Sequence, residues 1–446
     1  MSGPPALRYH DLRHVTGQAT LIDIDNGVVE SAGTSFFNRA ILRVLGPRGW
    51  GILQIDNFSP CPKKKFNSLL ASAARLAAIT QQDVNLADAE YRPLSVPAMK
   101  EDPRDIGIEE KTAILSEIEL AASHPDVVNR RANYIERSEQ VMFTDSSGHE
   151  FSYEICRSGF NVLAVASRNG TVQMGYERAH SIHGFNIRHK QEYGRKAAGI
   201  AVKLLDAGHA KGGIMRALLD PELAGVFAHE AIGHASEGDL VQEGNSVLAG
   251  KVGTQIGNDQ LNITDDPSVP EFGFEPFDAE GVAVQPTTII RNGVVHAFLH
   301  SRETLAAVGD GMAGHARAMS AEPPLVRMSN TYIGNGDATL EEIMEACGNG
   351  ILLKGSRGGQ VDPGRGIFQF NAEYGYLIEG GECTSMVRDV SLSGEILSTL
   401  HGILLCGNDR TMHPGYCGKG GQSVPVSDGA PHVLLDNAVV GGSGTH

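Results

Sequence analysis

Long apolar runs are absent from this 446-residue sequence, and none approaches the roughly 18 residues needed to cross a bilayer. Residues 1–14 carry two prolines and several charges, so we do not expect a signal peptide there. The six cysteines include no Cys-x-x-Cys pair, which indicates free thiols in a reducing compartment. These absences argue against a membrane protein and a disulfide framework, and they predict a cytoplasmic location.

Basic residues are also fewer than acidic ones. The 37 lysines and arginines are outnumbered by 53 acidic residues, which gives a formal net charge of −16. Such a chain repels phosphate backbones and anionic lipids, so we expect neither nucleic acid nor a membrane surface as a partner. The only basic run, residues 63–65, is more typical of a solvated loop.

The length and the hydrophobic patterning predict an α+β protein with three parts. Residues 1–100 and 101–212 are expected to form two N-terminal modules, followed by a strand-rich C-terminal domain over residues 213–446. No phosphate-binding glycine loop interrupts this pattern, so no nucleotide cofactor is expected.

Alternating apolar residues and turns predict most of the N-terminal elements. Short strands are expected within residues 20–55, with a hairpin at Asp25-Asn26-Gly27 and a turn at residues 46–49. The expected helices cover residues 66–79, 108–122 and 192–206, and further strands cover residues 127–137, 141–144, 150–157, 161–167 and 171–176. In the C-terminal part, helices are expected around His229, near Leu305 and over residues 340–347.

The helix around His229 carries the most informative motif. Asp220 can cap its N-terminus and Pro221 suits its first position, so the helix delivers His229 and Glu230 near its C-terminal end. His234 follows five residues after His229, whereas the familiar zinc helix spaces its histidines by four.

That spacing has a geometric consequence. On a regular α-helix, His229 and His234 would point roughly 140° apart. Both imidazoles can reach one metal only if the helix ends or bulges between them, and Gly233 is the residue that permits such a break. We therefore predict that α geometry is lost between Ile232 and His234.

The motif favours metal-assisted hydrolysis, with Glu230 as the general base for an attacking water. A match to His-Glu-x-x-x-His arises by chance in roughly one of 25 sequences of this composition, so two ordinary helical histidines are the alternative.

A metal would need a third protein ligand. Glu237 lies close by, and residues 406–422 supply Cys406, His413 and Cys417. Cys417 stands among glycines, which let the backbone approach a metal, whereas Cys406 follows an apolar run typical of a buried thiol.

These residues resemble the signature of the TldD/PmbA metallopeptidases, in particular the catalytic TldD-type subunit. The resemblance covers roughly residues 213–443 in the family's order, and its blocks are residues 229–239, 327–332, 358–362, 407–409, 417–422 and 436–442. The first 200 residues match only loosely.

The resemblance implies roles for four residues: His229, His234 and Cys417 as Zn²⁺ ligands and Glu230 as catalytic base. It also implies an active site enclosed in a dimer, formed either by two identical chains or with a PmbA/TldE-like subunit that lacks the metal motif.

Four further residues are candidates for substrate binding. Arg317 and the adjacent His315 match a family block, although a surface arginine and a structural histidine are the alternatives. Gly358 and Gly359 mark a place where an extended peptide or another backbone comes close.

The function predicted from these features is zinc-dependent cleavage of peptide bonds. A small-molecule amidase or N-deacetylase is the alternative within enzymes, and a non-catalytic partner subunit is the alternative outside them.

Overall fold

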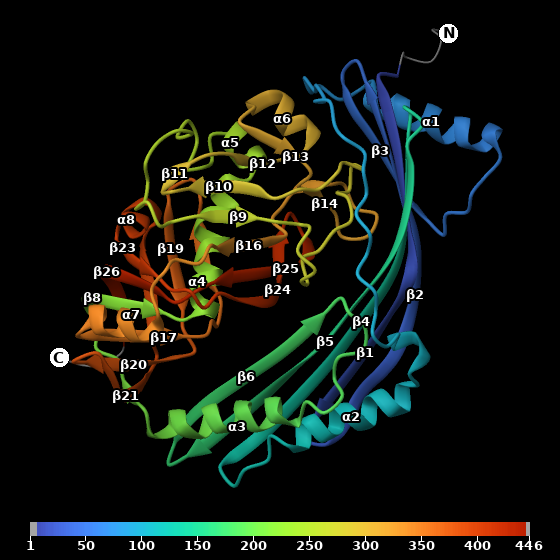
Figure 1. Ribbon diagram of the computed structural model, residues 1–446. Coiled ribbons are helices and arrows are strands. Elements are labelled where there is room, and N and C mark those ends of the chain that lie inside the picture. The colour runs from blue at the N-terminus through green and yellow to red at the C-terminus, as the bar shows by residue number, and fades with distance from the viewer. Residues whose placement is uncertain (1–6, 443–446) are drawn as a thin grey trace.

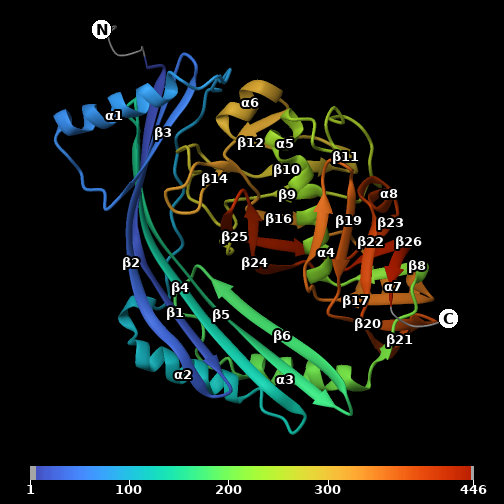
Figure 2. The same cartoon turned by 180° about the vertical axis from the view of Figure 1, so that it is seen from behind.

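A computed structural model describes residues 7–442 as an α+β protein, which confirms the predicted fold class (Figure 1). The N-terminal strands form a long curved sheet, and the C-terminal half of the chain lies on its concave side (Figures 1 and 2). None of the helices in the described residues is long and apolar enough to cross a membrane.

The curved sheet is antiparallel, in the order β3-β2-β1-β4-β5-β6. Its strands are β1 (Tyr9–Asp25), β2 (Val28–Gly46), β3 (Gly49–Asp56), β4 (Val127–Asp145), β5 (Glu150–Arg168) and β6 (Thr171–Ser181). Because β1 pairs with β4 along most of its length, residues 1–100 and 101–212 contribute three strands each to one continuous sheet.

The turns of this sheet lie where the sequence predicts them, but the two predicted breaks within strands do not occur. Asn26 and Gly27 adopt φ values of 48° and 77°, as a tight hairpin requires. Residues 127–137 and 141–144 belong to one strand, β4, and residues 150–157 and 161–167 to one strand, β5. The polar Ser138 stays extended because it pairs with Gln18 on one side and Cys156 on the other.

Three helices pack on the curved sheet, close to their predicted positions. They are α1 (Lys63–Ala77), α2 (Ile108–Leu120) and α3 (Gln191–Asp206). The helix α1 lies at one end of the sheet, where Ala73 and Ala74 pack on Leu42 and Val44, whereas α2 and α3 lie at the other end (Figure 1).

The C-terminal part is built from two larger sheets. The first has the order β11-β10-β9-β16-β25-β24, formed by β9 (Ile263–Asp265), β10 (Thr287–Arg291), β11 (Val294–Val295), β16 (Asn330–Ile333), β24 (Thr411–Lys419) and β25 (Gln422–Ala430). Two short pairs accompany it: β12 (Phe298–His300) with β13 (Gly311–Ala313), and β14 (Ala316–Arg317) with β15 (Leu325–Val326).

The second sheet has ten strands, with β18 at one edge. Its path is β18-β19-β22-β26-β8-β17-β20-β21-β7, and β23 pairs with β26. Its strands are β7 (Gly208–His209), β8 (Gly213–Leu219), β17 (Gly350–Lys354), β18 (Gly359–Asp362), β19 (Ile367–Asn371), β20 (Tyr374–Glu379), β21 (Glu382–Arg388), β22 (Ser391–Glu395), β23 (Ile403–Cys406) and β26 (Val433–Gly441).

Helix α4 (Pro221–Phe227) lies in the main hydrophobic core of this part. Leu223 and Phe227 are fully buried, and so are Ala231 and Ile232 just after the helix. The remaining helices are α5 (Gly238–Gln242), α6 (Arg302–Val308), α7 (Leu340–Cys347) and α8 (Ile396–His401). Because α4 is held by the core, the side chains at its C-terminal end have a fixed position.

Candidate metal centre

The N-terminus of α4 is anchored as the sequence predicts. Asp220 accepts a hydrogen bond from the backbone N–H of Leu223 at 3.0 Å, and Pro221 occupies the first helical turn. The Asp220 carboxylate also accepts from the backbone N–H of Gly355, at the end of β17. The start of the helix is therefore fixed to the ten-stranded sheet.

The C-terminal end of α4 widens into a π-helical turn, Ala228–Gly233. In a π turn the hydrogen bond spans five residues, and here the backbone N–H of His234 donates to the carbonyl oxygen of His229. The two rings consequently approach each other, with centroids 5.3 Å apart. The predicted loss of α geometry is confirmed, but it begins at Ala228.

Gly233 has a different role from the predicted one. Its φ of −54° and ψ of −58° are helical, so it does not break the helix. A Cβ added at Gly233 would lie 2.9 Å from Cγ of Met328. Close packing on Met328 therefore requires the glycine.

Cys417 joins the two histidines from β24. One ligand atom from each of His229, His234 and Cys417 lies within 4.8 Å of the other two. Cys417 Sγ is 3.4 Å from Nε2 of His234, and both Cys417 and His229 are at most 4% exposed. Cys406, in contrast, is buried elsewhere in the core, as predicted.

A carboxylate lies next to the Nδ1 atom of each imidazole. Asp428 Oδ1 lies 2.7 Å from Nδ1 of His229, and Glu237 Oε2 lies 3.2 Å from Nδ1 of His234. Lys419 Nζ donates to Glu237 at 3.0 Å. Such partners orient metal-binding imidazoles and leave the opposite ring nitrogen for the ligand position.

Sequence reasoning missed Asp428 and placed Glu237 among the candidate ligands. Asp428 lies on β25, 199 positions after His229, and no local motif marks it. Only the packing of β25 against α4 brings the two together.

The cluster is electrostatically coupled. Burial raises the pKa of the Cys417 thiol, but the imidazoles of His229 and His234 outweigh it and lower that pKa to about 5. Burial lowers the pKa of His234, but hydrogen bonds to Cys417 and Glu237 raise it to about 9. The protein thus favours a thiolate at Cys417, which is the form that binds metals.

Glu230 lies beside this cluster and lines an open pocket. Its Oε2 is 3.8 Å from Nε2 of His234, and the pocket of about 430 Å³ is also lined by Glu237, Gly359, Gln360 and Lys419. Burial raises the pKa of Glu230, and the adjacent imidazoles oppose that shift. A carboxylate next to an open space, and not itself within the three-residue cluster, is placed to exchange a proton with a molecule in the pocket.

The donor set fits zinc. Two imidazoles and a thiolate are ligands that Zn²⁺ prefers, and catalytic zinc sites combine three protein ligands with one open position. Among the described residues, no other group of histidine, cysteine, aspartate or glutamate side chains clusters in this way.

The four candidate substrate-binding residues separate into two pairs. Arg317 is buried, and its guanidinium donates to Glu275 at 2.8 Å and to two backbone carbonyls, while His315 is buried with Nε2 3.7 Å from Asp265. Neither residue lines the pocket beside Glu230. Gly359 does line it, and Gly358 precedes it with a φ of +81°.

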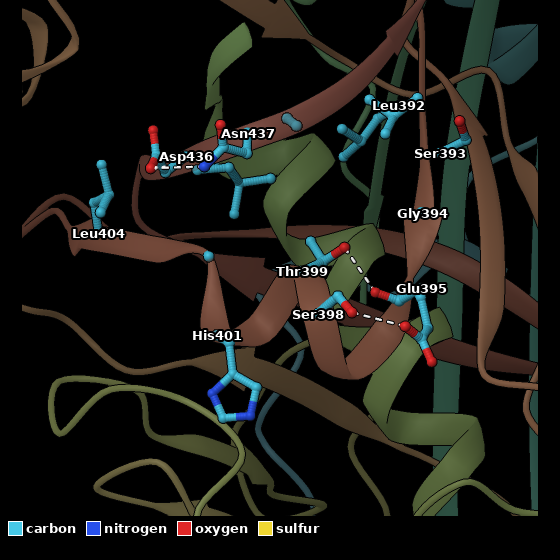
Figure 3. Close-up of a pocket in the computed structure, with 14 residues that line it drawn as sticks. Leu392, Ser393, Gly394, Glu395, Ser398, Thr399, His401, Leu404, Asp436 and Asn437 are labelled. Carbon is cyan, nitrogen blue, oxygen red and sulfur yellow. Dashed lines mark hydrogen bonds between the residues drawn. The ribbon is translucent and has the colours of Figure 1, made fainter. Parts of the chain in front are cut away.

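A different pocket, of about 390 Å³, lies between β22, α8 and β26 (Figure 3). Glu395, Ser398, Thr399 and Asn437 line it, and the first three are linked by hydrogen bonds (Figure 3). None of the predicted site residues belongs to it.

Taken together, the helix, the cluster and the adjoining carboxylate form an arrangement that fits a metallohydrolase site. The models of the PmbA/TldA metallopeptidase C-terminal and central domains match residues 212–442 and 101–205. The chain belongs to this family, which is also called TldD/PmbA.

Relatives extend over the whole chain. A protein named metalloprotease from Archaeoglobus fulgidus is 38% identical over 98% of this chain and 100% of its own length. Another metalloprotease, from Methanothermobacter thermautotrophicus, is 37% identical over 98% of this chain and 96% of its own. A zinc metalloprotease TldD homolog from Saccharolobus solfataricus is 32% identical over 72% of each chain.

Two solved structures share the fold. A putative modulator of a DNA gyrase from Thermotoga maritima has a TM-score of 0.82 at 21% identity and covers 97% of this chain and 96% of its own. TldE from Thermococcus kodakarensis has a TM-score of 0.77 at 20% identity, with the same two coverages.

Proposed function

We propose that this chain is a zinc-dependent metallopeptidase of the TldD type, which cleaves amide bonds with Glu230 as general base. The observation that carries the proposal is the convergence of His229, His234 and Cys417 beside Glu230. A bound zinc ion would supply Lewis acidity to the scissile carbonyl and to the attacking water.

The protein's own residues divide the remaining work. His229, His234 and Cys417 would hold the ion, and Asp428 and Glu237 would keep the imidazoles in the binding orientation. Glu230 accepts the proton of the attacking water and delivers it to the departing amine. The raised pKa of Glu230 suits the first step, because a carboxylate that binds a proton more tightly is a better base.

The edge strand β18 supports a peptide as substrate. Gly359 begins this strand and lines the pocket that Glu230 also lines. As an edge strand, β18 has one side free of strand partners within its sheet. An extended peptide can therefore lie along β18 with its backbone close to Gly358 and Gly359.

The family assignment supports a proposal about assembly, and the composition supports one about location. We propose a dimer, either of two identical chains or with a TldE-like subunit, and the fold shared with a TldE supports the second arrangement. We also propose a cytoplasmic location and no nucleic-acid or membrane partner, in keeping with the net charge of −16.

A small N-acyl amine is the alternative substrate, because a pocket of about 430 Å³ is of the size that holds small ligands. To separate the two, the purified protein is analysed for metal, stripped with a chelator, reloaded with zinc, and incubated with a mixed peptide and N-acyl amine library. We expect one zinc per chain and cleavage of peptides. If only N-acyl amines are cleaved, the protein is an amidase and not a peptidase. If the protein folds without zinc and hydrolyses no member of the library, it is not an enzyme of this kind.

Two cysteine variants test the metal ligands in the same assay. Cys417→Ala should lose zinc, whereas Cys406→Ala should keep it, because both thiols are buried but only Cys417 adjoins the imidazoles. Equal zinc content in the two variants would exclude Cys417 as a ligand.

A further inference from the structure

A third pocket lies where the curved sheet faces the metal-binding part. It has a volume of about 370 Å³, and residues of β6, α3, the start of α4 and β24 line it. Its acidic and basic lining residues are Glu177, Arg178, His180, Lys196, Glu222, Glu271, Glu373 and His413. We refer to it as the Glu373 pocket.

Glu373 is the unusual member of this lining. The residue as a whole is only 9% exposed, and its carboxylate, which faces the pocket, has no hydrogen bond or ion pair with any residue from 7 to 442. Packing fixes it, since a Cβ added at Gly355 would lie 2.8 Å from Cγ of Glu373. A buried carboxylate without a partner is costly unless a cation joins it.

The surroundings disfavour the charged form of Glu373 unless a cation pairs with it and displaces its proton. Burial raises the pKa of Glu373 to about 8, with a further contribution from Glu222, while Arg357 opposes the shift. Arg178 does not supply the missing charge, because it already pairs with Glu222 at 2.8 Å and donates to the carbonyl of Pro414. Four carboxylates therefore face only two permanently basic side chains in this pocket.

A divalent metal is not the expected occupant. Among the described residues, the cluster of His229, His234 and Cys417 alone is tight enough to hold a metal ion. The carboxylates of the Glu373 pocket are spread around a larger space, which suits an organic cation with several N–H donors.

The pocket is close to the metal centre along two paths. Glu222 precedes His229 by seven residues on the same helical segment, which corresponds to about 10 Å at 1.5 Å per residue. His413 pairs with Asp428 across β24 and β25, and Asp428 stands behind His229. About three residues of extended peptide cover such a distance.

We propose that the Glu373 pocket binds a cationic group of the peptide substrate, either a lysine or arginine side chain or a free N-terminal amine. This inference rests on the proposed peptidase function and adds a substrate preference to it. Glu373 is the residue that pairs with the cation, and the carboxylate of Glu177, which lines the same pocket, favours it by its charge.

The test compares matched peptides. A series of acetylated, quenched fluorescent peptides carries either lysine or norleucine at each position from two to four residues on either side of the cleaved bond. We expect lysine to increase kcat/KM at least about tenfold at one position, as a hydrogen-bonded charge pair does. In Glu373→Gln the ratio of kcat/KM for the lysine peptide to kcat/KM for the norleucine peptide should fall to about one. The kcat/KM of the norleucine peptides should stay within about twofold of the wild-type value.

Glu395→Gln is the matched control, since Glu395 lines the unrelated pocket of Figure 3. It should leave the lysine-to-norleucine ratio unchanged. A wild-type ratio near one at every position, or an unchanged ratio in Glu373→Gln, overturns the proposal. Free arginine amide and an N-terminally unblocked peptide then distinguish a side chain from a terminal amine as the preferred cation.

Calorimetry separates failure of this inference from failure of the proposed function. If no peptide is hydrolysed, the peptidase assignment fails, and titration of the same lysine and norleucine peptides into wild type and Glu373→Gln decides about the pocket. Tighter binding of the lysine peptide that is lost in Glu373→Gln supports the cation site. Equal binding, no binding, or binding of Mg²⁺ or Mn²⁺ in place of the peptide overturns it.

Discussion

The backbone N–H of His234 donates a hydrogen bond to the carbonyl oxygen of His229, five residues earlier. This π-helical turn brings the two ring centroids to 5.3 Å, whereas a regular α-helix would rotate the side chains about 140° apart. The wide turn is therefore the local feature that allows a five-residue spacing to serve one metal.

Packing at Gly233 supports this turn, and Gly233→Ala should damage it. The new Cβ would lie 2.9 Å from Cγ of Met328, so the turn or the methionine must move. We expect a loss of about 1–3 kcal/mol in the free energy of unfolding, together with weaker zinc binding. Thermal denaturation and zinc titration measure the two effects.

Two further variants make that prediction specific. Gly199→Ala in α3 meets nothing within 4 Å and should be neutral or slightly stabilising. Shortening the neighbour in Gly233→Ala/Met328→Val should recover part of the zinc affinity. Unchanged zinc binding in Gly233→Ala alone would show that the π turn does not depend on this contact.

Asp428→Asn should weaken zinc binding without abolishing it. The carboxylate lies 2.7 Å from Nδ1 of His229 and holds that ring, and loss of such a partner costs about tenfold to a hundredfold in metal affinity. Competition with a chromogenic chelator gives the affinity.

A matched aspartate–histidine pair provides the control. Asp409 Oδ2 lies 2.6 Å from Nδ1 of His432, but neither residue belongs to the cluster. Asp409→Asn should leave zinc affinity unchanged. An equal loss in both variants would point to a general effect on folding.

Glu373 should make the protein less stable as the pH rises. Its pKa is raised to about 8 in the folded chain, mainly by burial, from about 4.3 in an unfolded chain. Between these values the folded state holds a proton that the unfolded state has released, so the free energy of unfolding falls with increasing pH. The loss of free energy of unfolding caused by Glu373 is absent below about pH 4.3 and complete above about pH 8.

Glu373→Gln removes this dependence. The variant's Tm relative to wild type should therefore increase from pH 5 to pH 8, with a gain of at most about 1.4 kcal/mol per pH unit. Differential scanning calorimetry of the zinc-loaded protein in both forms measures it. A Tm difference that is constant over this range would contradict a buried, unpaired carboxyl.

Local patterns allowed much of the fold to be predicted. The cap at Asp220, the hairpin at Asn26-Gly27 and the helix over residues 340–347 all depend on neighbouring residues, and all occur in the structure. The joining of β4 and β5 into long strands could not be predicted, because pairing on both sides overrides the polar residues in their middle.

In the candidate site, too, the features that depend on neighbouring residues could be predicted, and those that depend on distant segments could not. The motif at His229 and the glycines around Cys417 are visible in the sequence, and the structure brings these segments together. Asp428 and Glu373 were missed because their environment is created by distant strands. Arg317 looked available for substrate, but its partner Glu275 is 42 residues away in sequence.

The most direct test of the account is Glu230→Gln, with zinc content and amide hydrolysis measured on the same preparation. Glutamine keeps the volume but cannot accept the proton of water, and Glu230 lies outside the three-ligand cluster. For Glu230→Gln we predict one zinc per chain, as in wild type, and at least about a hundredfold loss of turnover, while the exposed Glu243→Gln keeps both. Near-normal turnover by zinc-loaded Glu230→Gln would contradict the assignment of Glu230 as the general base.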